Sequence, residues 1–462
     1  MSTAALECRL ARAARLAPGQ PALITPEGTL TFGELDAHVS RRAAALQAQG
    51  LGAGAWTALR ITTSVAGVAD WLAVLRAGAR PLPVSTRLPE AALASLLAEH
   101  AVPGAIPEPG GTLQATGYGE AVPPAEGLQQ RLDPDAPCAG IATSGSTGRP
   151  SVVVHSYANY VRSAQGAIDY LPLAAGDRYL LSLPLFHVGG LGILFRCLEA
   201  TAPMVLGGRA EDAAFLASYG ITHVSLVETQ LRRLLGEAPD PLPPLRYALL
   251  GGGPVAPELL EAAEARGLPC YMSYGLTEMT AQVAAWPARR GGGRVLPYRE
   301  LAIDGAGEIC VRGETLCLGY LEAGAVRPLA DADGWYRTRD LGRWQDGRLT
   351  VLGRRDNQFV CGGENVQPEA VEQALREHPA ISEAVVVPRS DPDLGQRPVA
   401  FLRYAGQAVP AAALRDWLRD RLSPPLIPVA YHPLPATEGL KVPRRELTER
   451  AEQLRGDPEA SA

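Results

Sequence analysis

Short apolar segments alternate with helical segments along the first part of the chain, and this alternation limits the fold more than any other feature. The predicted strands are 56–61, 80–84, 180–183, 203–206 and 247–250. The predicted helices are 32–49, 65–76, 190–200, 210–219 and 228–235. This order is typical of α/β layering, in which helices cover a parallel or mixed sheet.

The pattern changes in the last third of the chain. Short strands with turn signals are predicted at 307–312 and 348–352. The remaining segment has a size that can fold alone, and its predicted elements are a helix at 368–377, strands at 383–388 and 399–404 and a helix at 411–421. We therefore expect an N-terminal α/β domain over 1–352 and a C-terminal α+β domain over 353–462, because 462 residues exceed one compact core.

Composition excludes several classes of protein. A formal net charge of -6 gives no general attraction to nucleic acid or anionic lipid. No segment approaches the roughly 20 apolar residues of a membrane span, and the start of the chain has the pattern of an amphipathic helix without an apolar signal core. The seven cysteines form no C-x-x-C pair, which favours buried reduced thiols. A cytoplasmic enzyme is expected, and a homo-oligomer is left open.

A single lysine is the most unusual feature of the composition. Lysine and arginine together number 43, yet Lys441 is the only lysine. Some positions need a compact ammonium on a flexible stem, which a planar guanidinium cannot replace. The lone lysine suggests such a position, with chance survival as the alternative.

Three segments offer groups suited to a nucleotide. Residues 141–154, IATSGSTGRPSVVV, form a Ser/Thr/Gly loop that can direct N–H groups and hydroxyls at a phosphate, although no lysine follows as in a Walker loop. Residues 274–278, YGLTE, follow the glycine turn 251–253 and offer an aromatic ring, a hydroxyl and a carboxylate. Residues 335–340, WYRTRD, end in an acidic side chain suited to ribose. Each alone also fits an ordinary loop, core contact or cap.

Two more segments complete the set: 353–369, GRRDNQFVCGGENVQPE, and 439–447, GLKVPRREL. In this order and spacing, the five segments resemble the adenylate-forming superfamily of acyl-CoA synthetases, luciferases and peptide-synthetase adenylation domains, over essentially the whole chain. The resemblance implies a large layered N-terminal domain of α/β and α+β structure and a small mobile C-terminal domain. It also implies ATP, Mg²⁺ and coenzyme A, and an acyl-AMP intermediate.

The superfamily pattern assigns roles to individual residues. The ATP-binding residues would be Thr143, Ser144, Gly145, Ser146, Thr147, Gly148, Gly251, Gly252, Gly253, Tyr274, Gly275, Asp340 and Arg354. Among them, the loop residues would wrap the β- and γ-phosphates, the glycine turn and Tyr274 would frame adenine, and the last two would bind ribose. The catalytic residues would be Lys441, Thr277, Glu278 and His187, with Thr277 at the α-phosphate and Glu278 on Mg²⁺.

The remaining roles concern the acid, the hinge and coenzyme A. The acid-binding residues would be His187, Arg196, Ser225 and Ser273. Asp356 would be the hinge of the small domain, and Gly362, Gly363 and Glu364 would approach the coenzyme A side. Arg196 stands within an apolar helical segment, where a charge is costly unless paired, so a second carboxylate on the substrate is an attractive partner. A surface arginine is the alternative.

The superfamily pattern also explains the lone lysine. A carboxylate that attacks the α-phosphate of ATP brings two anions together, so positive charge must bridge both in the transition state. The pattern places that lysine at Lys441. One position departs from the family, because its phosphate loop usually ends Gly-x-Pro-Lys and Ser151 stands at the lysine position here. Arg149 could supply the charge, ATP could bind more weakly, or the chain could be inactive.

Within the superfamily, the chain is most similar to the o-succinylbenzoate-CoA ligases of menaquinone biosynthesis. The likeness rests on its short length and on LSLPLFHVGGLGILFR at 181–196, SLVETQLRRLL at 225–235 and FVCGGENVQPEAVE at 359–372. It implies conversion of o-succinylbenzoate to its coenzyme A thioester. The alternatives are a synthetase for another aryl or medium-chain acid, a catalytically impaired binding relative, and a carrier-loading adenylation domain.

Overall fold

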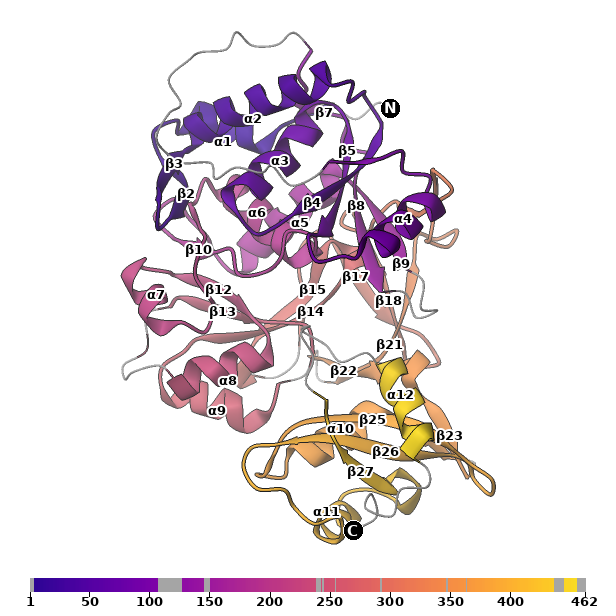
Figure 1. Ribbon diagram of the computed structural model, residues 1–462. Helices are drawn as coiled ribbons and strands as arrows, with labels where there is room; N and C mark the ends of the chain where they lie inside the picture. The colour runs from indigo at the N-terminus through magenta and orange to yellow at the C-terminus, as the bar shows by residue number, and fades with distance from the viewer. Residues whose placement is uncertain are drawn as a thin grey trace. The chain divides into compact units, whose positions relative to one another are not determined.

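The computed structural model describes residues 4–106, 127–144, 150–237, 242, 245–253, 255–290, 293–345, 348–362, 364–435 and 444–454. The chain divides into two compact units (Figure 1). The first comprises residues 1–302 and 311–336, and the second comprises 303–310 and 337–462. The expected functional boundary at 352/353 stays a prediction, since these units are defined by packing alone.

The first unit has nine described α-helices, and several of them begin at a side chain that caps the helix. They are α1 (Arg9–Leu16), α2 (Phe32–Ala48), α3 (Val65–Arg76), α4 (Glu90–Glu99), α5 (Tyr157–Tyr170), α6 (Val188–Ala200), α7 (Ala213–Ser218), α8 (Glu228–Glu237) and α9 (Pro257–Ala265). At α2 the Thr31 side chain accepts from the Glu34 N–H and the Glu34 side chain accepts from the Thr31 N–H, which is a capping box. Ser156 and Asn159 form the same box at α5.

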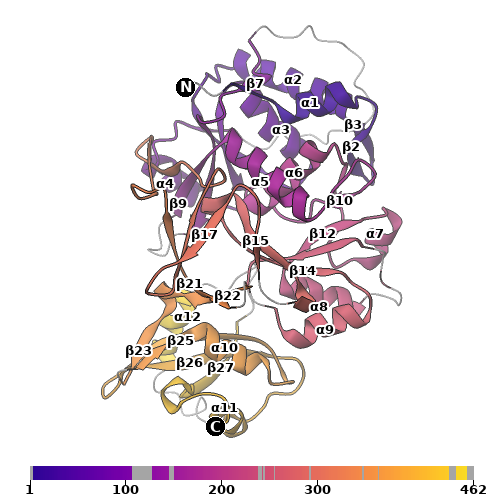
Figure 2. The same cartoon turned by 180° about the vertical axis from the view of Figure 1, so that it is seen from behind.

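A nine-stranded sheet is the centre of the first unit. Its order is β16 (Arg294–Val295), β15 (Ala281–Pro287), β14 (Cys270–Leu276), β13 (Tyr247–Leu250), β12 (His223–Leu226), β10 (Tyr179–Leu180), β11 (Met204–Val205), β2 (Pro21–Thr25) and β3 (Gly28–Thr31). The strands from β14 to β2 in this order are parallel. The helices α8 and α9 lie side by side next to β12–β14 in Figures 1 and 2.

Two predicted strands of this sheet are shorter than expected. The prediction at 180–183 corresponds to β10, which ends at Leu180, and the prediction at 203–206 corresponds to β11. The N–H of Ser182 turns back to the carbonyl of Leu180 over 2.9 Å, which ends the ladder there. By contrast, β13 and the helix α3 have the predicted bounds.

Smaller sheets complete the arrangement. One has the order β20 (Ala325–Arg327), β19 (Gly319–Glu322), β9 (Pro150–Ser156) and β8 (Pro137–Ser144). Others are β5 (Arg80–Ser85) with β4 (Trp56–Ile61) and β6 (Ala105–Ile106), and β1 (Leu6–Glu7) with β7 (Arg131–Leu132). A further sheet has the order β17 (Glu300–Ile303), β18 (Glu308–Arg312), β21 (Tyr336–Gln345) and β22 (Arg348–Arg354). The short 3-10 helices are η1 (Thr277–Met279), η2 (Ala288–Arg290), η3 (Arg355–Asn357) and η4 (Pro424–Leu426).

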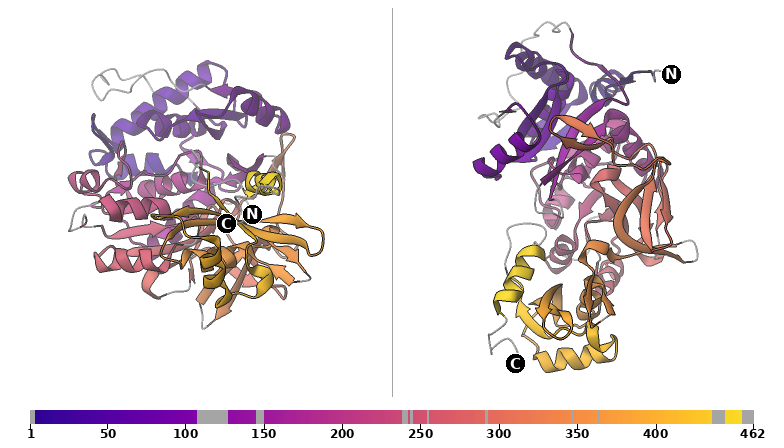
Figure 3. Two further views of the ribbon diagram at one scale, coloured as in Figure 1. Left: turned by 60° about the horizontal axis from the view of Figure 1, so that its bottom comes forward. Right: turned by 90° about the vertical axis from the view of Figure 1, so that its right-hand side faces the viewer.

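Besides β22 and most of β21, the second unit contains a five-stranded sheet with helices on both faces (Figure 3). Its strands are β24 (Glu364–Val366), β23 (Phe359–Cys361), β26 (Gly395–Tyr404), β25 (Ile381–Asp391) and β27 (Ala430–Pro433). Its helices are α10 (Pro368–Arg376), α11 (Ala411–Arg419) and α12 (Arg444–Gln453). Val386 packs with α10 and α11, whereas its neighbour Val387 packs with Leu447 of α12. Alternation along β25 therefore buries both faces.

Composition led to expectations about the cysteines and about membrane-spanning helices, and the structure bears on both. All seven cysteines are buried and free, as expected for reduced core thiols. Burial raises the pKa of the Cys270 thiol to about 12, so that this thiol stays protonated. Among the described helices, none has the length and apolar character that crossing a bilayer requires.

Candidate active site

The predicted ligand-binding residues of the first unit lie at the carboxyl ends of neighbouring parallel strands. Ser225 lies in β12, the turn Gly251–Gly253 directly follows β13, and Ser273, Tyr274 and Gly275 lie in β14. These three strands are adjacent and run in the same direction. Open α/β sheets bind ligands at this edge, so the arrangement favours a shared site.

Two glycines of this edge are required by the backbone. Gly252 has a φ of +86°, in the left-handed region that favours glycine. At Gly275, where a bulge follows Tyr274 in the β14–β15 ladder, a Cβ atom would lie 2.0 Å from the carbonyl oxygen of Ala281. The close approach of two backbones therefore excludes any side chain at Gly275.

The phosphate-loop segment begins and ends on a β-hairpin. In the register of β8 and β9, Thr143 pairs with Ser151 and Ser144 pairs with Pro150. The Oγ1 hydroxyl of Thr143 donates to the carbonyl of Ser151 over 3.2 Å. Gly145, Ser146, Thr147 and Gly148 lie outside the described residues, as does Arg149. The hairpin thus shows the two ends of the loop side by side, with Ser151 at its base.

Thr277 is held by a histidine that the sequence did not single out. The Nε2 atom of the buried His155 lies 2.8 Å from the carbonyl oxygen of Thr277 in η1. Its Nδ1 atom lies 3.3 Å from the hydroxyl of Tyr160. Burial lowers the pKa of His155 to about 4, although the bond to Thr277 opposes this shift. Since a carbonyl only accepts, a neutral ring must carry its proton on Nε2.

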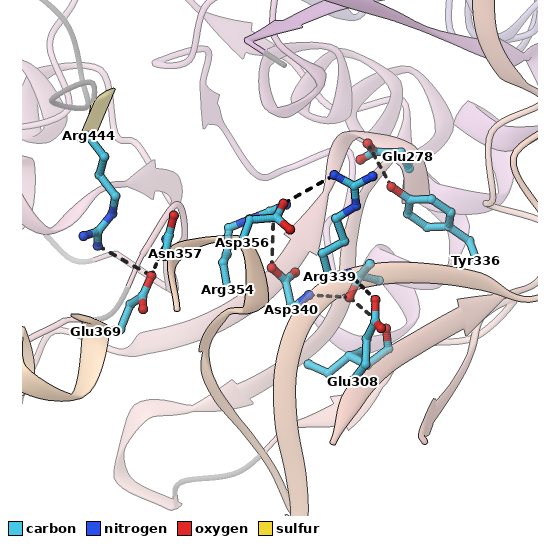
Figure 4. A network of polar contacts seen from close by, with 12 residues as sticks. Glu278, Glu308, Tyr336, Arg339, Asp340, Arg354, Asp356, Asn357, Glu369 and Arg444 are labelled. Carbon is cyan, nitrogen blue, oxygen red and sulfur yellow. Dashed lines mark hydrogen bonds and ion pairs between the residues drawn. The ribbon is translucent and has the colours of Figure 1, made fainter. Parts of the chain in front are cut away.

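Glu278, the predicted Mg²⁺ ligand, is oriented by two phenols. The hydroxyls of Tyr320 and Tyr336 lie 2.8 and 3.4 Å from the same oxygen, Oε1. Figure 4 shows Tyr336 beside Glu278. Burial, followed by the charge of Glu278, raises the pKa of Tyr320 well above its usual range, so Tyr320 remains a donor. No group of three or more His, Cys, Asp and Glu side chains suited to a metal occurs among the described residues. A single carboxylate nevertheless fits Mg²⁺, which is commonly held by one or two carboxylates and substrate phosphates.

Arg196 lies inside the first unit, as the apolar surroundings of its helix predicted. Arg196 is 6% exposed, and its NH1 group donates to the hydroxyl of Tyr179 over 3.3 Å. The Tyr179 hydroxyl lies 2.9 Å from Oγ of Ser225. The structure therefore joins two predicted acid-binding residues through Tyr179, whose buried hydroxyl required a partner. His187 precedes α6 as its N-cap residue and is exposed.

A small cavity borders the guanidinium of Arg196. Its volume is about 10 Å³. The lining residues are Ala167, Leu171, Leu173, Tyr179, Arg196, His223, Tyr247, Leu249 and Gln282. Burial is the main cause that lowers the pKa of His223, so this ring adds no charge at neutral pH. Among the residues that the structure describes, no acidic side chain lines the cavity.

In the second unit, Asp340 and Arg354, to which the family pattern assigns ribose, form an ion pair. Asp340 and Arg354 are opposite each other in the β21–β22 ladder, and an Arg354 nitrogen lies 3.3 Å from Asp340 Oδ1. Arg339 and Arg354 lie 3.5 and 3.4 Å from Oδ2 of Asp356, the predicted hinge residue (Figure 4). Arg339 adopts the left-handed region at φ +64°, and its N–H donates over 2.8 Å to the fully buried carboxylate of Glu308. Glu308 was not predicted from the sequence, because its partners are distant along the chain.

The predicted coenzyme A turn is described in part. Gly362 has a φ of +57°, and its N–H donates to the carbonyl of Leu394 over 2.9 Å. Glu364 lies in β24 and accepts from the hydroxyl of Ser423 over 3.3 Å. Gly363 and Lys441 lie outside the described residues.

The described chain resumes at Arg444, and this residue is firmly bound. Its guanidinium pairs with Glu372 over 2.7 Å and donates to the carbonyl of Val386 over 2.6 Å. A second carboxylate, Glu369, lies 3.5 Å away and accepts from the amide of Asn357 over 2.5 Å (Figure 4). These contacts fix the first turn of α12 to α10 and β25.

Comparison with known proteins identifies the class. Residues 10–321 match the family model of AMP-binding enzymes, and residues 370–438 match that of the AMP-binding enzyme C-terminal domain. The chain therefore belongs to the AMP-binding enzyme family. The expected adenylate-forming fold, with a large layered N-terminal domain and a small C-terminal domain, is confirmed.

Individual relatives narrow the family. The 2-succinylbenzoate–CoA ligase of Escherichia coli strain K12 is 37% identical, over 91% of this chain and 93% of that protein. The o-succinylbenzoate coenzyme A synthetase of Bacillus subtilis has been solved with the acyl-adenylate intermediate OSB-AMP and with ATP and magnesium ion. Both structures are 29% identical to this chain, and each match covers 96% of it. The match covers 98% of the solved chain with OSB-AMP, with a TM-score of 0.86, and 99% of the solved chain with ATP and magnesium ion, with a TM-score of 0.85. Within the AMP-binding enzymes, the chain belongs to the 2-succinylbenzoate–CoA ligase family.

Proposed function

We propose that this protein is an AMP-forming acid–CoA ligase that converts 2-succinylbenzoate, also called o-succinylbenzoate, to its coenzyme A thioester in menaquinone biosynthesis. In the first step, a carboxylate oxygen attacks the α-phosphorus of ATP, and the bond to the bridging oxygen breaks to release pyrophosphate. In the second step, the sulfur of coenzyme A attacks the acyl carbon, the thiol proton is lost, and AMP leaves. Family membership supports this chemistry.

The observation that favours 2-succinylbenzoate is the uncompensated charge of Arg196. This buried guanidinium donates to the Tyr179 hydroxyl and has no acidic partner among the described residues. A buried charge is costly unless an opposite charge pairs with it. Because 2-succinylbenzoate has two carboxylates, one can react while the other pairs with Arg196. A monocarboxylic aryl or medium-chain acid would leave the guanidinium unpaired.

The roles of single residues are part of the proposal. Lys441 supplies the positive charge that bridges the attacking carboxylate and the α-phosphate. Glu278 would hold Mg²⁺, which neutralises charge on the phosphates, and its orientation by Tyr320 and Tyr336 supports this role. Thr277 contacts the α-phosphate. The phosphate-loop, adenine, ribose, hinge and coenzyme A assignments made from sequence stay predictions.

Other parts of the proposal rest on family membership alone. Coenzyme A is the acceptor, in preference to a carrier protein, because the family name specifies a CoA ligase. The reaction is placed in the cytoplasm, and the oligomeric state stays open. Ser151 stands at the base of the phosphate hairpin, where the family usually has a lysine. The alternative function is therefore that of a catalytically impaired binding protein.

Product formation tests the proposal. The protein is incubated with ATP, Mg²⁺, coenzyme A and 2-succinylbenzoate, beside a panel of benzoates and fatty acids, and thioesters are detected by mass spectrometry. We expect the 2-succinylbenzoyl thioester, and its loss in Lys441→Arg. Thioesters from other acids alone would contradict the substrate but keep the ligase class. Absence of ATP–pyrophosphate exchange with every acid would support the impaired relative.

A further inference from the structure

The side-chain amide of a buried glutamine in the same cavity as Arg196 has no hydrogen-bond partner among the described residues. Gln282 lies in β15, is 4% exposed and lines the same cavity as Arg196. Neither its Oε1 nor its Nε2 atom has a partner among the described residues, and the Nε atom of Arg196 also has none. A buried amide without a hydrogen bond loses its contacts with water and gains none in return, which is costly. The two orphaned groups therefore indicate a polar ligand in the cavity.

The charge around this cavity indicates the sign of the ligand. Arg299 is also buried. Its guanidinium donates to the backbone carbonyl of Gln282 over 2.5 Å and to the backbone carbonyl of Pro297 over 2.7 Å. Its NH2 group donates to the Ser163 hydroxyl over 3.0 Å. All these acceptors are neutral, and burial together with the charge of Arg196 lowers the pKa of Arg299 to about 9. Two buried arginines without a carboxylate favour an anion.

The Arg196 guanidinium lies close to the start of β15, the strand that carries Gln282. A Cβ atom on Gly192 would lie 3.3 Å from NH2 of Arg196 and 3.7 Å from Cβ of Ala281, the residue before Gln282. The guanidinium thus crosses Gly192 toward β15. The cavity of about 10 Å³ has room for one water-sized group. It can hold one oxygen atom of a ligand, but not an aromatic ring.

We infer that Gln282 is a specificity-determining residue that donates its amide N–H to the second carboxylate of the acid, the group that also pairs with Arg196. This inference rests on the proposed function. Arg299 is then a positioning residue, because its bond to the Gln282 carbonyl holds β15 and its charge keeps the site positive. A neutral substituent on the acid would leave both Gln282 and Arg196 unsatisfied. The amide and the guanidinium together therefore select a dicarboxylic acid.

The test compares two acids in each variant. The acids are 2-succinylbenzoate and 4-oxo-4-phenylbutanoate, which retains the reacting carboxylate but lacks the ring carboxylate. Gln282→Met removes the amide with little change in length, and Gln282→Glu places a carboxylate beside Arg196. We expect kcat/KM for 2-succinylbenzoate to fall about 10- to 100-fold in Gln282→Met, and more in Gln282→Glu, because this bond has a charged acceptor. The value for the monocarboxylate should change less than about threefold, because this acid has no second carboxylate for the amide to bind.

Controls separate this inference from the proposed function. Gln165→Met alters a glutamine that does not line the cavity, and it should leave the ratio of the two kcat/KM values unchanged. If Arg196→Leu lowers the ratio and both Gln282 variants leave it at the wild-type value, the inference about Gln282 is wrong and the proposed function stands. If the wild type shows no preference for the dicarboxylate, both are wrong. Equal losses on the two acids would indicate a purely structural role and overturn the inference.

Discussion

The Nε2–H group of His155 donates to the backbone carbonyl of Thr277 over 2.8 Å. His155 belongs to β9, the strand that follows the phosphate-loop segment, and Thr277 begins η1. One neutral side chain therefore connects two segments to which the family pattern assigns phosphate contacts.

The first prediction concerns pH. Burial lowers the pKa of His155 from 6.5 to about 4, so between these values the unfolded chain binds a proton that the folded chain does not. The free energy of unfolding should therefore rise with pH across this window, and this group should contribute at most about 1.4 kcal/mol per pH unit. The same contribution is lost as the pH falls through the window. His155→Gln retains an N–H donor but does not titrate, so urea unfolding should show a flatter pH dependence. The exposed His187→Gln is the control; equal slopes in both variants would refute the assignment.

The second prediction concerns Mg²⁺. In Tyr320→Phe/Tyr336→Phe, Glu278 loses both donors to Oε1, so its orientation should be less well defined. We expect the Mg²⁺ concentration for half-maximal pyrophosphate exchange to rise about fivefold, as for a lost hydrogen bond. Calorimetry should show weaker ATP binding with Mg²⁺ and unchanged binding without it. Tyr298→Phe is the control, because Tyr298 contacts Arg162 through its ring and the variant keeps that ring. An unchanged Mg²⁺ requirement in the double variant would show that the phenols do not position Glu278.

The third prediction concerns the β14–β15 backbone. Gly275→Ala must separate the two strands, because the new Cβ would overlap the Ala281 carbonyl. We expect a loss of about 3 kcal/mol in the stability of the first unit, measured by chemical denaturation. Gly236→Ala is the matched control, since no atom lies within 4 Å of its added Cβ. Alanine there should be neutral or stabilise α8 by about 0.5–1 kcal/mol. Similar stabilities for the two variants would contradict the steric argument.

The fourth prediction concerns the attachment of α12. Glu372→Leu leaves Arg444 without its bidentate partner, so hydrogen exchange in α12 should accelerate and the second unit should lose about 3 kcal/mol. Adding Arg444→Leu should recover part of this loss. The neighbouring pair Arg445–Glu449 is exposed, so Glu449→Leu should change stability by less than about 1 kcal/mol. Equal effects from the buried and exposed pairs would refute the role of Glu372.

Local patterns in the sequence predicted elements whose boundaries are set locally. The strand β4 and helix α3 have the predicted bounds, and Ser64 caps α3 by accepting from the Gly67 N–H. The strand β10 was overestimated because its end depends on a turn at Ser182 that apolar character does not reveal. Sequence reasoning therefore succeeded where neighbours along the chain determine the structure.

The candidate site shows the same division. The motifs identified Arg196 and Glu278, whereas Tyr179 and the Tyr320–Tyr336 pair were missed. Their roles come from partners that folding brings from distant segments, and a single sequence contains no record of those contacts. Gln282 was missed for another reason: the evidence for it is the absence of a partner among the described residues.

The burial of all seven cysteines has a practical consequence for spectroscopy. A cysteine introduced at an exposed position would be the only solvent-accessible thiol, so maleimide coupling should modify that position alone without removal of native residues. Two such positions, one in each compact unit, would allow a donor and an acceptor dye to be attached. Energy transfer between the dyes could then follow the separation of the units through a turnover cycle in an otherwise native chain.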